Sequence, residues 1–109
     1  MTKRNKYDAD LINDLVGVFK QTNMVSTVLA HFDNCRSYRK LGGNEESLRG
    51  NEKYFSVELP YNDMSEKFLY WLYECNDFVY ISVDDGILFG FSDRNDALMC
   101  KIRYMGRGE

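Results

Sequence analysis

Four aspartates in the second half of the chain are the residues best suited to hold a divalent cation. Mg²⁺ takes hard oxygen ligands, and carboxylates gathered around it support phosphoryl chemistry. Aspartates are equally typical of tight turns and of helix N-termini, where the helix dipole favours negative charge. We favour this structural explanation and predict no metal and no cofactor. The four residues are Asp84, Asp85, Asp93 and Asp96.

His31 and Cys35 are four residues apart, as a base and a nucleophile on one face of a helix would be. No third group or oxyanion donor accompanies them, and Cys35 belongs to the apolar face of the predicted helix, where a thiol is usually inert. Cys75 and Cys100 form no Cys-x-x-Cys pair, which argues against a disulfide framework and against structural zinc. We therefore predict reduced core thiols and no enzymatic activity.

Three aromatic residues, Tyr70, Trp71 and Tyr73, lie close together on a predicted helix. Aromatic side chains off the buried face of a helix make good binding anchors because they supply large, rigid contact areas. The alternative is edge packing under a neighbouring loop. Three aromatics within four residues exceed what one core stripe holds, so we include them in a predicted partner-binding surface.

The net charge of −3 conceals two segments of opposite sign. Residues 58–96 contain nine acidic and two basic residues (−7), and the remainder has twelve basic and eight acidic residues (+4). An acidic patch steers a basic partner, although acidic residues also protect exposed strand edges. We predict that four acidic residues at one end of a hairpin complete the partner-binding surface: Glu74, Asp77, Asp84 and Asp85.

Basic residues near the end of the second predicted helix and near the C-terminus suggest an alternative, nucleic-acid-binding strip. Cations in such a strip bind phosphates, but they also solvate helix C-termini through the helix dipole. A sequence pI of about 5.2 weighs against nucleic acid as the partner. The strip comprises Arg36, Arg39, Lys40, Lys101, Arg103 and Arg107.

The elements that position these residues form one α+β domain, since 109 residues suffice for a single core. Apolar residues recur at helical spacing over 9–21, behind a possible Asp8 cap, and again from Met24 to Cys35. Residues 24–32 also suit a strand, and the sequence leaves both readings open. The predicted organisation is a helical part at 1–41, a mobile loop at 42–53, a β-α-β-β-α unit at 54–105 and a tail at 106–109.

Within the unit, residues 54–60 alternate like a half-buried strand that Pro60 ends. Asp63 is expected to cap a helix whose buried face is Met64, Phe68, Leu69, Leu72 and Cys75. Two strands, 78–83 and 87–91, flank a turn and form a hairpin. Asp93 is expected to cap a last helix with Ala97, Leu98, Ile102 and Met105 facing inward.

This order predicts a split β-α-β arrangement, a ferredoxin-like variant with a three-stranded antiparallel sheet. The third strand lies between the first two, and both helices lie on one face. The other face is then covered by the N-terminal helices or left open for a partner or a second copy.

Residues 54–105 resemble the RNA recognition motif family through the segments Phe55 to Pro60, Met64 to Cys75 and Phe89 to Ala97. The resemblance implies the split topology. It implies none of the family's RNA-binding residues, because the positions of the two stacking aromatics fall on Leu88 and Gly86 and the fourth strand is missing.

The segment Phe91 to Tyr104 is similar to the close of small accessory proteins of tailed bacteriophages, which commonly bind and redirect host machinery. The resemblance implies a non-enzymatic protein that inhibits a host protein with a basic surface by occluding it. The alternatives are a small RNA- or DNA-binding module and a self-assembling structural protein, for which a homodimer is expected. A cytoplasmic location is expected, because no unbroken apolar stretch follows the basic start.

Overall fold

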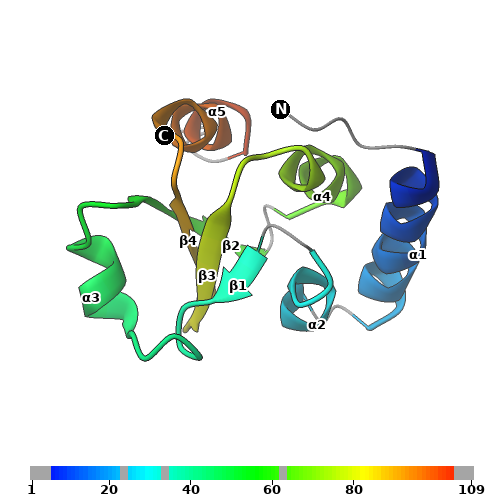
Figure 1. Cartoon of the computed structure of the whole chain (residues 1–109). Helices are drawn as coiled ribbons and strands as arrows, with labels where there is room; N and C mark the ends of the chain where they lie inside the picture. Colours follow the sequence, from blue (N-terminus) through cyan, green and yellow to red (C-terminus); the bar gives the residue numbers. More distant parts are fainter. Residues whose placement is uncertain (1–5, 23–24, 33–34, 62–63, 105–109) are drawn as a thin grey trace.

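The computed structural model describes residues 6–22, 25–32, 35–61 and 64–104, which form an α+β fold around one mixed sheet (Figure 1). The helices of this part of the chain are α1 (Lys6–Thr22), α2 (Val25–Leu29), α3 (Glu45–Arg49), α4 (Glu66–Tyr73) and α5 (Arg94–Tyr104). Its strands are β1 (Cys35–Ser37), β2 (Phe55–Pro60), β3 (Phe78–Val83) and β4 (Gly86–Phe91). None of these helices has the length and apolarity to cross a membrane.

The sheet has the order β1-β3-β4-β2, in which β4 lies between β2 and β3 and is antiparallel to both. This part matches the predicted split β-α-β arrangement. The prediction of only three antiparallel strands is wrong, because β1 adds a fourth strand parallel to β3, with Cys35 opposite Phe78. Three residues are too short a stretch to show strand alternation in a sequence.

The second predicted helix is much shorter than expected. Helix α2 ends at Leu29, and the chain turns through a bond from the His31 N–H to the Val28 carbonyl before it enters β1. The apolar residues that continued the helical period have another role, since Phe32 and Cys35 are buried in the core after the helix has ended. Periodicity alone did not separate these two arrangements.

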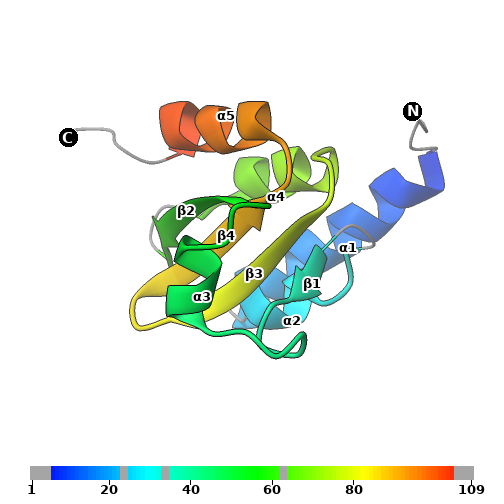
Figure 2. The same cartoon turned by 60° about the vertical axis from the view of Figure 1, so that its left-hand side comes forward.

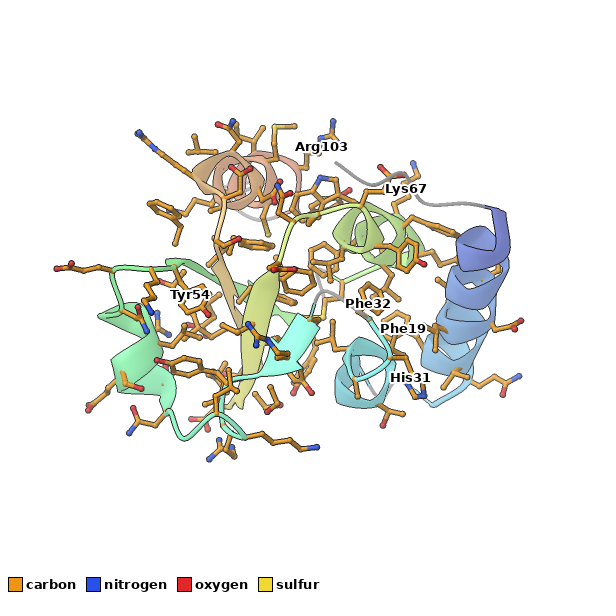
Figure 3. All side chains as sticks on the ribbon, viewed as in Figure 1. Phe19, His31, Phe32, Tyr54, Lys67 and Arg103 are labelled. Atoms are coloured by element: carbon orange, nitrogen blue, oxygen red, sulfur yellow. The ribbon has the colours of Figure 1, made fainter. Side chains whose placement is uncertain are left out.

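The main core lies between one face of the sheet and four helices, α1, α2, α4 and α5. Figures 1 and 2 show α4 and α5 together on one side of the sheet, as predicted, with α3 on the other side. Figure 3 shows Phe19 and Phe32 among the helices α1, α2 and α4. The buried residues of the sheet that face this core are Cys35, Val57, Leu59, Phe78, Tyr80, Ile87, Phe89 and Phe91.

The opposite face of the sheet is covered by α3 and its flanking segments. Leu48 of α3 contacts a smaller buried cluster of Val79, Ile81 and Leu88, with partly buried tyrosines beside it. The expectation that the N-terminal helices cover this face, or that it is open, is therefore wrong. Helices α1 and α2 instead extend the core on the α4 side, where Leu15 and Val28 are buried.

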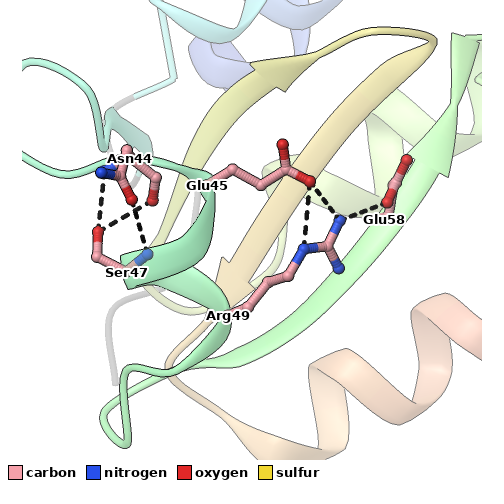
Figure 4. Close-up of polar contacts among 5 residues, drawn as sticks. All are labelled: Asn44, Glu45, Ser47, Arg49 and Glu58. Carbon is pink, nitrogen blue, oxygen red and sulfur yellow. Dashed lines mark hydrogen bonds and ion pairs between the residues drawn. The ribbon is translucent and has the colours of Figure 1, made fainter.

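Residues 42–53 contain α3 and are not a loop without secondary structure. A capping box starts the helix: Asn44 Oδ1 accepts from the Ser47 N–H at 2.8 Å, and Ser47 Oγ accepts from the Asn44 N–H at 2.9 Å (Figure 4). Arg49 then bridges Glu45 of the helix and Glu58 of β2, with N···O distances of 2.8 and 2.6 Å. One buried leucine and these polar contacts hold a helix whose sequence has no apolar period.

The other elements follow the predicted pattern with corrected ends. Helix α1 begins at Lys6, so Asp8 lies inside the helix and does not cap it. Ser65 caps α4 by accepting from the Phe68 N–H, whereas Asp63 lies outside the described residues. The predicted buried face of α4 is confirmed in full: Met64, Phe68, Leu69, Leu72 and Cys75.

Helix α5 has the predicted start but a different buried face. The Asp93 carboxylate accepts from the Asn95 N–H at 2.8 Å, as a cap does. Ala97 and Cys100 are buried, whereas Leu98 and Ile102, predicted to face inward, are 44% and 71% exposed. Met105 lies outside the described residues.

Candidate functional site

The thiols do not form a nucleophilic centre in the described part of the chain. Cys35 lies in β1 and not on a helix with His31, whose Nδ1 lies instead 3.0 Å from the Thr27 carbonyl oxygen. Burial raises the pKa of the Cys35 and Cys75 thiols, and it raises the pKa of Cys100 to about 12. The three thiols are therefore protonated at neutral pH, so no base and thiolate pair is present in this geometry.

The four aspartates considered as metal ligands do not converge. Asp84 and Asp85 form the turn between β3 and β4, whereas Asp93 and Asp96 lie at the start of α5, beyond the far end of β4. Among the described residues, no three His, Cys, Asp or Glu side chains come together in a way that could hold a metal ion.

The acidic residues predicted to surround one end of the hairpin lie at its two ends. Glu74 and Asp77 precede β3, and Asp84 and Asp85 follow it. Six residues of strand extend about 20 Å, so the two pairs do not surround the same end of the hairpin. The expectation of a single cluster is wrong in this respect.

The fold instead brings the segment of Glu74 and Asp77 beside Asp93, which precedes α5, and Asp96 of α5, at a place that we call the acidic end (Glu74, Asp77, Asp93 and Asp96). Asn76 connects these elements: its backbone N–H donates to Asp96 Oδ2 at 3.1 Å, and its side-chain amide donates to Asp93 Oδ2 at 2.8 Å. Glu74 and Asp77 are exposed and the aspartates of α5 are partly exposed.

A further contact joins the segment that leaves β4 to the residue before β3. Ser92 donates from both its N–H and its hydroxyl to the Asp77 carbonyl oxygen, at 3.2 and 2.7 Å. Burial raises the pKa of the Cys75 thiol most, and nearby charges, including those of Asp96, Glu74 and Asp93, raise it further. The hairpin register supplies the signal that sequence reasoning missed, because Phe78 opposite Phe91 places Asp77 beside the segment that enters α5.

Of the three aromatic residues predicted to bind a partner, Tyr70 is the one that is exposed. It is 39% exposed and lies one helical turn before Glu74 on α4, so the two side chains share a face. Trp71 is partly buried, with its ring 5.4 Å from that of Tyr104. Tyr73 is 5% exposed, with its ring edge-on to Phe32 at 5.7 Å. Trp71 and Tyr73 thus belong to the core packing.

The basic residues do not form a continuous strip. Arg36 lies in β1, at one edge of the sheet, and Arg39 and Lys40 follow in the next turn. Lys101 and Arg103 lie on α5, which packs on β2 and β4 in the other half of the sheet. Figure 3 shows Arg103 on the outer side of that helix. Arg107 lies outside the described residues.

The sheet face and the sheet edge, where a partner or a second copy was expected to bind, are covered or protected in the described residues. Leu88, at one of the two stacking positions, is buried under Leu48 of α3. The Tyr61 N–H donates to the Asp85 carbonyl and continues the hydrogen-bond ladder between β2 and β4. The β2 residues whose backbone groups point to the free edge of the sheet are therefore Ser56, Glu58 and Pro60. Proline has no N–H, and a charged residue at an edge opposes strand addition.

Comparison with known proteins gives no match to this chain among family models, curated proteins or solved structures.

Proposed function

We propose that this chain is a non-enzymatic protein-binding module that docks on a basic surface of a partner protein through Tyr70 and the acidic end. The observation that carries the proposal is the exposed ring of Tyr70 four residues before Glu74, which belongs to the acidic end that Asn76 joins through its bonds to Asp93 and Asp96. Aromatic anchors supply contact energy at interfaces, and complementary charge supplies steering and orientation.

The acidic end is organised before any partner arrives. Asn76 donates to both Asp93 and Asp96, and Ser92 donates to the backbone carbonyl of Asp77. A surface with few groups left to order loses less conformational entropy on binding.

The proposed mechanism is occlusion, in which the module covers a basic site that its partner uses. The similarity of the segment Phe91 to Tyr104 to small phage accessory proteins supports a host protein as the partner and the host cytoplasm as the location. The separation of the basic residues and the protected edge at Pro60 favour this function over nucleic-acid binding and over self-assembly through β2.

Affinity capture from a bacterial lysate tests the proposal with two charge-matched variants. Glu74→Gln with Asp77→Asn removes two charges from the acidic end, and Asp84→Asn with Asp85→Asn removes two from the hairpin turn. We expect the unmodified chain to capture one protein in stoichiometric amount, also after nuclease treatment. The first variant should fail to capture this protein, and the second should still capture it. Recovery of nuclease-sensitive nucleic acid alone, or loss of the captured protein with the turn variant only, would contradict the proposal.

A further inference from the structure

Tyr70 lies between two glutamates on the outer face of α4. Glu66 precedes it by four residues and Glu74 follows it by four, and all three residues are exposed. Glu74 caps the helix but keeps a right-handed helical backbone conformation. Residues four apart lie one above the other on a helix, so Tyr70 has one carboxylate on each side along α4.

The chain supplies a cation to only one of these two carboxylates. Lys20 of α1 reaches Glu66, with its Nζ 2.8 Å from Glu66 Oε2. The pKa of Lys20 is raised, mainly by its hydrogen bond to Glu66 and the charge of that residue, and also by Tyr70, which places the ammonium near both side chains. In the described part of the chain no ion pair involves Glu74. The carboxylate on the far side of Tyr70 is therefore available to a cation from outside.

We propose that Tyr70 and Glu74 bind an arginine side chain of the partner, and that Lys20 directs the arginine to this side of Tyr70 by holding Glu66. The inference rests on the proposed function and names the chemistry of its partner. A guanidinium group stacks on an aromatic face and presents paired N–H donors to a carboxylate, whereas the ammonium of lysine is a strongly hydrated point charge. A cation that approached Glu66 would instead meet Lys20 and be repelled.

Lys20 is a positioning residue in this arrangement, because it acts on the partner through Glu66. The ion pair is exposed, with 60% of the Lys20 side chain and 48% of the Glu66 side chain accessible, so it adds little to stability. Its effect is on the distribution of charge along α4. With Glu66 neutralised, the negative charge beside Tyr70 lies toward the acidic end, which orients a basic surface in that direction.

The test uses the full chain labelled with ¹⁵N and a short peptide with blocked ends that carries two arginines. The same peptide with lysine in place of arginine tests the stacking, and the same peptide with uncharged citrulline tests the charge. We expect the arginine peptide to shift the amides of residues 70–77, with an affinity about three-fold above that of the lysine peptide, and the citrulline peptide to shift none. Equal affinities of the arginine and lysine peptides, or no shifts over residues 70–77, would overturn the inference.

Variants with the same loss of charge separate the role of Lys20 from a general effect. Lys20→Gln should extend the shifts caused by the arginine peptide to residues 65–67 and raise its affinity about two-fold, because Glu66 becomes available. Lys53→Gln, at an exposed lysine between α3 and β2, should change neither the pattern nor the affinity. Glu74→Gln should remove the preference for arginine.

A merely structural role of Lys20 would lower the thermal midpoint of Lys20→Gln without moving the pattern of shifts, and that result would refute the inference. The lysate capture decides the proposed function separately. If the capture still depends on Glu74 and Asp77 while Lys20→Gln and the unmodified chain give identical titrations, the inference fails and the proposed function stands. Loss of this dependence in the capture would contradict the proposed function itself.

Discussion

Leu48 of α3 packs directly over Gly90 of β4, where a Cβ atom would lie 2.7 Å from Leu48 Cδ1. The same atom would lie 3.1 Å from Tyr54 Cβ and 3.1 Å from Val79 Cγ2. On the second face of the sheet, Leu48 thus fits a position where the strand has no side chain. The stability of this face depends on the match between the two residues.

Gly90→Ala should lower the free energy of unfolding by about 1–3 kcal/mol, because overpacking of a filled core forces neighbouring side chains to shift. Urea denaturation measures the change. Gly17→Ala in α1 is the matched control, since no other group lies within 4 Å of its Cβ position. The control should gain about 0.5–1 kcal/mol from helix propensity. Equal effects of the two substitutions would contradict the packing described here.

Leu48→Ala should lower the free energy of unfolding by about 2–5 kcal/mol, the range for truncation of a buried leucine. It should also speed amide exchange of residues 45–49, because Leu48 is the buried residue of α3. Leu41→Ala, at an exposed leucine in the preceding turn, should change stability by less than about 0.5 kcal/mol. If residues 42–53 behaved as an unstructured loop, the two truncations would have the same small effect.

Trp71→Ala and Tyr70→Ala should separate packing from binding. Trp71 packs against Phe68, Phe91 and Tyr104, so its removal should lower the free energy of unfolding by about 3 kcal/mol or more. Tyr70 is exposed, so its removal should leave stability nearly unchanged. It should lower the affinity for the captured partner about ten-fold or more. Thermal denaturation and titration of the partner give the two readouts. A Tyr70→Ala variant that binds normally would exclude Tyr70 as an anchor.

The buried thiols should make stability fall at alkaline pH. Burial raises the pKa of Cys100 from 9.0 to about 12, so between these values the unfolded thiol loses its proton and the folded one keeps it. The unfolded state then binds fewer protons, and stability decreases by on the order of 1 kcal/mol per pH unit for this thiol. Below pH 9 the contribution is fully present. Urea midpoints at pH 7 to 10 measure the loss of stability. Cys100→Ala should reduce the slope of stability against pH.

Reaction with a thiol reagent at pH 8 gives an independent check of the same burial. The folded chain should react slowly at Cys35, Cys75 and Cys100, because each thiol is buried and has a raised pKa. In denaturant all three should react quickly. Rapid labelling of the folded protein would show that one of them is accessible.

The predictable part of the fold comes from segments whose patterns are long and regular. The hairpin and the buried face of α4 follow from alternation, helical spacing and the Asp84 and Asp85 turn, and the position of β4 between β2 and β3 follows from the right-handed crossover rule. Strand β1 and helix α3 do not, because three residues show no alternation and α3 buries only Leu48. Their formation depends on tertiary contacts, here with Phe78 of β3 and with the cluster beneath α3.

The candidate site likewise has residues that the sequence indicates and residues that only the fold brings to them. Tyr70, Glu74 and Asp77 could be selected from the sequence because they lie off the buried face of a recognisable helix or just after it. Their neighbours Asp93 and Asp96 could be found only by following the strand register across the hairpin. The inward assignment of Leu98 and Ile102 failed because apolar residues surround α5 on more than one side, and the sheet contacts only one of them.

Photo-crosslinking from position 70 tests the central claim most directly. A benzophenone amino acid in place of Tyr70 probes the proposed interface, and the same group at Leu41 probes an exposed site remote from it in the sequence and on a different element. We predict one crosslinked bacterial protein from position 70, none from position 41, and loss of the product when Glu74→Gln and Asp77→Asn are added. Equal crosslinking from both positions, or a product from position 70 that the charge variant leaves intact, would contradict a docking surface built from Tyr70 and the acidic end.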